Sequence, residues 1–365
     1  MQQKLGRFRG CLLGLAVGDA MGYTVDAKTL DEICADYGPN GLLGYDLVNG
    51  YAEITSHTQL AAFTANGLLL ALTHQQMGRR SAPYIRYVAL AVREWSRSQR
   101  YCEPEKNHCW LSTVPEMKRR RCMDTMMLSF LDKDPLGTPE NPTNYSNLPA
   151  ALAEAIPIAL LSDRLFLPVQ ERDHLAAQAA AMTHGNPEAF LSAAVLCHVL
   201  SDLLSGSDEP AETLAHKALT AAQQAYGPDH PHMGKLWELY QMALTLASSD
   251  NLSPMDAMER LGCQSAAEVL AGALYACITC HGDFDAAMIT AVNHSGRSAA
   301  VGALTGALLG VKLGEDALPE FYLESLDTSS YLLELADDLF HGCPMDLGSS
   351  LFDDDWDRKY LHAGL

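Results

Sequence analysis

The chain has 365 residues, with 25 lysines and arginines against 45 aspartates and glutamates, and a formal net charge of −20. This balance excludes nucleic acid and anionic membrane surfaces as default partners, because both are bound by clustered cations. Hydrophobic residues make up 48% of the chain and aromatic residues only 7%, which indicates a soluble helical protein whose core is built from small and aliphatic side chains.

The predicted elements are all helices. Apolar residues recur at helical spacing, and no sustained alternation typical of a strand is present. Breakers such as Gly206, Asn186-Pro187 and Ser253-Pro254 separate the elements. In chain order, we predict helices over residues 4–18, 58–76, 83–99, 148–161, 172–182, 187–204, 211–226, 233–246, 265–280, 284–292, 298–313 and 330–340, with a long loop over 132–147.

Two of these segments contain glycines at every fourth position. The first series comprises Gly6, Gly10, Gly14, Gly18 and Gly22, and the second Gly302, Gly306, Gly310 and Gly314. This spacing places the glycines on one helix face, where a second helix backbone can approach closely. We therefore predict that the two segments cross at the centre of one domain. The predicted architecture is a single all-α domain over residues 1–345, followed by an acidic tail over 346–365 in which aspartates surround Trp356.

The location of the protein is predicted from its cysteines and its first residues. Ten cysteines are scattered along the chain, mostly in apolar helical runs, as is typical of reduced core residues. The apolar run that follows Arg9 ends at Asp19, before it reaches the length of a signal peptide or a membrane span. These features predict a cytoplasmic protein without a membrane partner.

Five motifs occur in a fixed order along the chain. They are RGCLLGLAVGDAMG at 9–22, TSHTQL at 55–60, NPTNYS at 141–146, THGNP at 183–187 and AVNHSG at 291–296. Together they resemble the ADP-ribosylglycohydrolase family. The resemblance implies an all-helical fold, two Mg²⁺ ions as cofactors and the removal of ADP-ribose from modified side chains.

The sequence departs from the family at the metal positions. After Thr55, where the family has paired aspartates, this chain has Ser56 and His57. The family's later aspartate motif is occupied by Arg297, Ala299 and Ala300, and its early glutamate by Asp26. The family's substrate loop contains an arginine. The corresponding residues of this chain, 147–154, end in Glu154 instead, which reverses the charge.

These departures predict that the metal centre is lost. Mg²⁺ requires hard oxygen ligands, usually carboxylates, and of the family's carboxylates only Asp26 is kept. We therefore expect no metal and no catalytic residue. One hypothesis is that the Arg297 guanidinium neutralises Asp26 or Asp19 in place of the metal. The residues expected to line the former cleft are Asp19, His57, Asn144, Glu154, His184 and Arg297. Asp19 also fits a helix cap, and His184 also fits a structural helix junction.

The function predicted from the resemblance and the charge is protein binding. A member that has lost catalysis can serve as an immunity protein, an antitoxin that blocks a cognate ADP-ribosyltransferase toxin, and an acidic surface suits a basic toxin domain. One alternative is a divergent glycohydrolase that uses Asp19, Asp26 or Glu154 as a general base. A metal-free ADP-ribose sensor is another.

Minor metal sites are further alternatives. His57 can ligate Zn²⁺, and so can a group formed by Cys102, His108, Cys109 and Cys122. Cys277 and Cys280 form a single C-x-x-C pair without a partner pair, which suits a core role better than a metal or redox role.

Overall fold

A computed structural model describes residues 2–79, 82–100, 107–122, 124–161, 164, 167–227, 230–249, 251–347 and 352–361. The described residues form one all-α domain, as predicted, and contain no β-strand beyond two isolated bridges. The longer helices are α1 (Gln2–Tyr23), α3 (Ser56–Gln76), α4 (Tyr84–Ser98), α9 (Val169–Thr183), α10 (Pro187–Leu204), α11 (Ala211–Tyr226), α12 (Pro231–Ala247), α14 (Ala266–Thr279), α16 (Ser298–Leu313) and α18 (Ser329–His341).

Shorter helices connect these elements. They are α2 (Leu30–Tyr37), α5 (Pro115–Lys118), α6 (Thr125–Phe130), α7 (Ala155–Leu160), α13 (Pro254–Leu261), α15 (Phe284–Val292), α17 (Glu320–Glu324) and α19 (Asp354–Tyr360), with 3-10 turns at Trp110–Thr113, Pro149–Glu154 and Glu315–Ala317. Helix α13 begins after Ser253, whose hydroxyl accepts the Asp256 N–H, as the Ser-Pro signal predicts. The predicted helix over 148–161 is divided into the 3-10 turn and α7.

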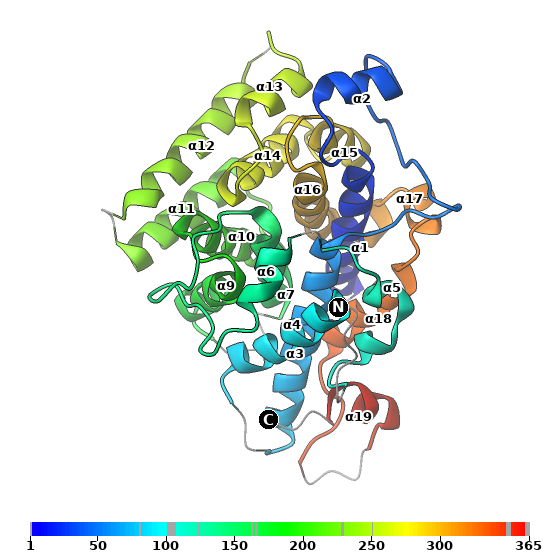
Figure 1. Ribbon diagram of the computed structural model, residues 1–365, viewed down its shortest axis with the longest axis vertical. Helices are drawn as coiled ribbons and strands as arrows, with labels where there is room; N and C mark the ends of the chain where they lie inside the picture. Colours follow the sequence, from blue (N-terminus) through cyan, green and yellow to red (C-terminus); the bar gives the residue numbers. More distant parts are fainter. Residues whose placement is uncertain are drawn as a thin grey trace.

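Helices α1 and α16 form the centre of the fold and lie side by side (Figure 1). Gly10, Gly14 and Gly18 of α1 face Gly310, Gly306 and Gly302 of α16 so closely that the two backbones touch. The predicted crossing of the two glycine series is thus confirmed. Helix α1 also extends beyond the predicted end to Tyr23, because its packing against α16 offsets the cost of interior glycines.

The remaining helices enclose this pair. Helices α10, α14 and α15 pack against α16, and α18 packs against α1. Helix α10 is apolar and long enough to cross a membrane, but 83% of it is buried inside the protein, as in the core helix of a soluble protein.

The acidic C-terminal segment is partly folded onto the domain. Helix α19 packs on α3, and the Trp356 indole N–H donates to the Thr73 hydroxyl at 3.0 Å. Trp356 is buried, so its ring does not project toward solvent as a partner contact would.

Candidate functional site

The site begins with Asp19, a fully buried carboxylate in the last turns of α1. Its Oδ2 accepts the backbone N–H of Thr55 at 2.9 Å and that of Thr58 at 3.1 Å, at the start of α3. The hydroxyl of Thr55 donates to Oδ1 at 2.5 Å, and that of Thr58 donates to Oδ2 at 2.6 Å. Asp19 therefore caps a neighbouring helix, and its hydrogen-bonding capacity is filled by protein donors.

His57 lies beside this carboxylate. Its Nδ1 is 2.9 Å from the Thr55 hydroxyl oxygen and 3.6 Å from Asp19 Oδ1. Because the Thr55 hydroxyl donates to Asp19, the network assigns the proton on the imidazole to Nδ1. Burial alone would raise the pKa of Asp19, but the His57 imidazole and the two threonine hydroxyls hold that pKa below its ordinary value.

Asp26 links the end of α1 to the start of α16. Its Oδ1 accepts the N–H of Ala299 at 3.2 Å, so the carboxylate binds one of the first-turn N–H groups that have no carbonyl partner within the helix. Burial raises the pKa of Asp26, and this effect outweighs the Ala299 hydrogen bond and the charges of His57 and Arg297. The structure thus brings together the three family metal regions, at Asp26, at residues 55–57 and at residues 297–300.

Arg297 does not take the role expected of it. The residue is exposed, and its side chain forms no hydrogen bond or ion pair with Asp26 or Asp19, all three being in the described part of the chain. It acts on Asp26 only through its charge at longer range. The hypothesis that the guanidinium replaces the metal by direct contact with a carboxylate is therefore wrong. Ala299 and Ala300 are buried in the first turn of α16, and Ser56 is half-buried at the first position of α3.

Asn144 and His184 belong to a buried junction. The Asn144 amide donates to the Thr183 carbonyl at 3.1 Å, and its oxygen accepts the Gly185 N–H at 3.0 Å. His184 Nδ1 lies 2.8 Å from the Thr183 hydroxyl, whereas Nε2 is buried and has no hydrogen-bond partner among the residues that the structure describes. Burial lowers the pKa of His184 to about 4, which favours the neutral imidazole. A neutral imidazole fixed in this way suits the structural helix junction.

Glu154 does not line an open cleft. It ends the 3-10 turn at Pro149–Glu154, it is fully buried, and neither carboxylate oxygen has a hydrogen-bond partner within the described residues. Burial raises the pKa of Glu154 well above its ordinary value. The raised pKa favours the protonated carboxyl, so the general-base role does not fit the position of Glu154.

We expect Glu154→Gln to stabilise the protein increasingly as the pH rises. A folded-state pKa above the unfolded value means that wild-type stability is complete below the ordinary glutamate pKa and falls as the pH rises toward the folded pKa. The neutral amide removes this loss, which is about 1.4 kcal/mol for each unit of pKa elevation. Urea unfolding at pH 5 and pH 8 measures it. An equal difference between variant and wild type at both pH values contradicts the buried neutral carboxyl.

The structure adds contacts that motif reading missed. Beside the start of α3, Glu53 binds Arg121 at 2.6 Å and Arg119 at 3.2 Å, and Arg119 also binds Asp327 at 2.7 Å. Such non-local ion pairs leave no pattern in the sequence. Thr58, by contrast, had a signal, because it follows the N-cap Thr55 by three residues and carries a hydroxyl in the first turn of the helix.

The residues at the family metal positions do not fit a pair of magnesium ions. Mg²⁺ needs near-octahedral oxygen ligation, whereas this location offers one carboxylate, Asp26, whose elevated pKa favours the neutral form. Within the described ranges, no group of three or more His, Cys, Asp or Glu residues can hold a metal ion. Cys102, part of one alternative zinc group, lies outside those ranges. Burial raises the thiol pKa of both Cys277 and Cys280, as expected for core cysteines.

Comparison with known proteins places this geometry in context. The profile of the ADP-ribosylglycohydrolase family matches residues 1–347. A solved structure described as an ADP-ribosylglycohydrolase-related protein complex is similar with a TM-score of 0.59 and 23% identity, covering 93% of this chain and 99% of that chain. At this identity the likeness concerns the fold alone. A comparison with curated proteins gave no match.

Proposed function

Because the chain belongs to the ADP-ribosylglycohydrolase family, we propose that it is a member that has lost dimetal catalysis and acts by binding another protein. The observation that carries the proposal is the donor set at the metal positions. Asp26 is the only carboxylate there, it already accepts the Ala299 N–H, and its pKa is raised. The buried carboxylate of Asp19 already accepts four hydrogen bonds, from the N–H groups and hydroxyls of Thr55 and Thr58.

A rigid exposed turn supports the binding role. In the turn at residues 47–51, Val48 and Tyr51 exchange backbone hydrogen bonds of 2.9 and 3.1 Å. Asn49 and Gly50 both have positive φ, of 53° and 85°, as a type I′ turn requires. Val48 is 51% exposed and Tyr51 is 55% exposed, so apolar side chains are held out toward solvent on a fixed backbone. Preorganised apolar side chains of this kind reduce the entropy cost of binding.

The turn is fixed to a second segment that also exposes an aromatic ring. The Ala52 N–H donates to the Ser325 carbonyl at 2.8 Å, and Phe321 of α17 is 55% exposed. Figure 1 shows the chain between α2 and α3 extending outward beside α17. Residues 38–55 and 313–328 contain no lysine or arginine, and Asp46, Glu320 and Glu324 are exposed there. This surface, the 47–51 turn with Phe321, fits a partner with an apolar pocket and a basic rim.

The partner that we propose is an ADP-ribosyltransferase, with the protein serving as an immunity protein in the cytoplasm. The family relation supports this choice, because its members act on ADP-ribosylated products. The acidity around the 47–51 turn also supports it, since complementary charge accelerates encounter with a basic protein.

The test combines catalysis and binding. We expect no release of ADP-ribose from modified arginine or serine with or without Mg²⁺, and no heat of Mg²⁺ binding in calorimetry. Inhibition of a transferase encoded beside this gene is expected, with a Kd that rises about 30-fold or more in Tyr51→Ala combined with Phe321→Ala. Phe352→Ala, which removes a ring that is 61% exposed elsewhere, is the matched control. Turnover stimulated by Mg²⁺ overturns the loss of catalysis, and failure to bind or inhibit the transferase overturns the partner.

A further inference from the structure

A cavity lies away from the family site, between the N-terminal ends of α4 and α9 and the C-terminal half of α11. Its volume is about 830 Å³, which is within the range of small-molecule sites. Tyr84 of α4 and Tyr226 of α11 supply aromatic surface to its wall, and Ile85, Leu175 and Ala222 supply aliphatic surface. The N-terminal end of helix α9 lines this cavity, and its C-terminal end forms the junction at Thr183 and His184.

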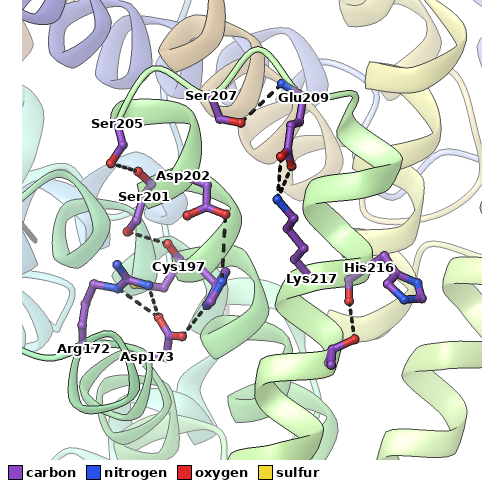
Figure 2. Close-up of polar contacts among 12 residues, drawn as sticks. Arg172, Asp173, Cys197, Ser201, Asp202, Ser205, Ser207, Glu209, His216 and Lys217 are labelled. Atoms are coloured by element: carbon purple, nitrogen blue, oxygen red, sulfur yellow. Dashed lines mark hydrogen bonds and ion pairs between the residues drawn. The ribbon is translucent and has the colours of Figure 1, made fainter.

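The charge on the cavity wall is negative. Glu140, Glu171 and Asp173 line it, and the lining residues, all within the described part of the chain, include no lysine or arginine. The charge of Asp173 is compensated by two residues that do not line the cavity. Arg172 binds its Oδ1 at 2.7 Å (Figure 2), and His198 Nδ1 lies 2.7 Å from its Oδ2. Glu171 is exposed and has no ion pair among the described side chains. Glu171 therefore remains for a ligand, and Glu140 faces only the His174 imidazole, at 3.9 Å, among the described ion-pair partners.

Tyr226 is positioned by its neighbours. Its hydroxyl lies 3.3 Å from His174 Nδ1, and His174 Nε2 lies 3.9 Å from Glu140 Oε1. The centroid of the Tyr226 ring lies 6.1 Å from the centroid of the Phe190 ring. Burial raises the pKa of Tyr226, and the charges of Glu140 and Asp173 contribute, so the phenol stays neutral. A neutral aromatic ring beside carboxylates is a surface that attracts organic cations.

We propose that this cavity binds a linear aliphatic polyamine. Two ammonium groups pair with Glu140 and Glu171, and the connecting methylene chain lies along Ile85, Leu175 and Tyr226. Glu171 has no ion pair among the described side chains and Glu140 has only the 3.9 Å contact with His174, so the two carboxylates favour a ligand with at least two positive charges. The aliphatic wall favours methylene groups over an inorganic cation. This site is independent of the proposed protein partner.

Calorimetry with spermidine on the full chain at 150 mM salt tests the proposal. We expect saturable binding to the wild type with one site, at least tenfold weaker binding to Glu140→Gln combined with Glu171→Gln, and much weaker binding of butylamine, which carries one charge. Glu238→Gln, on the exposed face of α12, is the matched control for nonspecific attraction by an acidic protein. A second variant, Ala225→Trp, places a bulky ring in the cavity and is expected to reduce binding without changing the charge.

Three results overturn the proposal. The first is an absence of saturable binding to the wild type. The second is an equal loss of affinity in Glu238→Gln and in the double variant, which identifies nonspecific attraction. The third is binding of butylamine as tight as that of spermidine, which contradicts recognition of two charges.

Discussion

Gly14→Ala is expected to lower the free energy of unfolding by about 3 kcal/mol or more, and its combination with Gly306→Ala to prevent folding. A methyl group on Gly14 would lie 2.8 Å from the carbonyl carbon of Gly306 and closer still to its oxygen. These atoms are backbone, so no side chain can rotate away. Relief requires α1 and α16 to move apart, and that movement also separates Asp26 from Ala299, which the two ends of these helices hold together.

Gly6→Ala is the matched control, since it makes the same change on the same helix and in the same glycine series. Its methyl group would have its nearest contact at 3.9 Å, the backbone nitrogen of Glu315. Alanine improves helix propensity by about 1 kcal/mol, so Gly6→Ala is expected to be neutral or mildly stabilising. Urea unfolding followed by circular dichroism measures both variants. Equal midpoints for Gly6→Ala and Gly14→Ala would contradict the close approach of the two backbones.

Asp19→Asn is expected to cost about 3 to 5 kcal/mol at pH 7, because hydrogen bonds to a charged acceptor contribute roughly 1.5 to 3 kcal/mol each. An amide keeps one acceptor oxygen but turns an NH₂ group toward donors of Thr55 or Thr58. The folded-state pKa of Asp19 is below its ordinary value, so its stabilising effect is present above the ordinary pKa and is lost as the pH falls through the folded pKa. The difference between variant and wild type is therefore expected to shrink below about pH 4.

Asp26→Asn is the control for this prediction. It alters the neighbouring carboxyl, whose pKa is shifted in the opposite direction, and the Asn carbonyl can still accept the Ala299 N–H. We expect a change within about 1 kcal/mol, in the stabilising direction at pH 7. Unfolding curves at pH 7, 5 and 3.5 separate the two cases. An Asp19→Asn variant as stable as Asp26→Asn at pH 7 would disprove the capping role of Asp19.

The parts of the fold that follow a repeating pattern were predictable from the sequence. The glycine step of four residues predicted the contact of α1 with α16, and the Asn186-Pro187 signal predicted the start of α10, where the Asn186 side chain accepts the Glu188 N–H. Short helices such as α2 and α17 were missed, because four to eight residues carry too little periodicity. The burial of Trp356 also has no signal in the sequence, because aspartates surround it while one face of the same short helix packs inward.

Which residues form the candidate site stays a prediction, whereas the burial of their side chains can be compared with the structure. The hydrogen bond from Ala299 to Asp26 joins two of the regions that the motifs indicated, and the Thr55 hydroxyl that donates to Asp19 ties the third region to α1. The exposure of individual side chains did not follow. Glu154 and Arg297 were both expected to line the cleft, yet Glu154 is fully buried and Arg297 is exposed. Position along a motif does not determine how far a side chain lies from solvent, because neighbouring helices of distant sequence decide it.

The pairing of α1 with α16 has a consequence for folding during synthesis. The facing glycines Gly14 and Gly306 are about 290 residues apart, so α1 must wait for most of the chain before its partner exists. Until then, the glycine face of α1 and the apolar residues beside it are unpaired and can form non-native contacts. Contacts between such distant segments slow folding and prolong exposure to aggregation. A chain that stops before residue 298 lacks the partner helix entirely, and we expect it to collect in inclusion bodies.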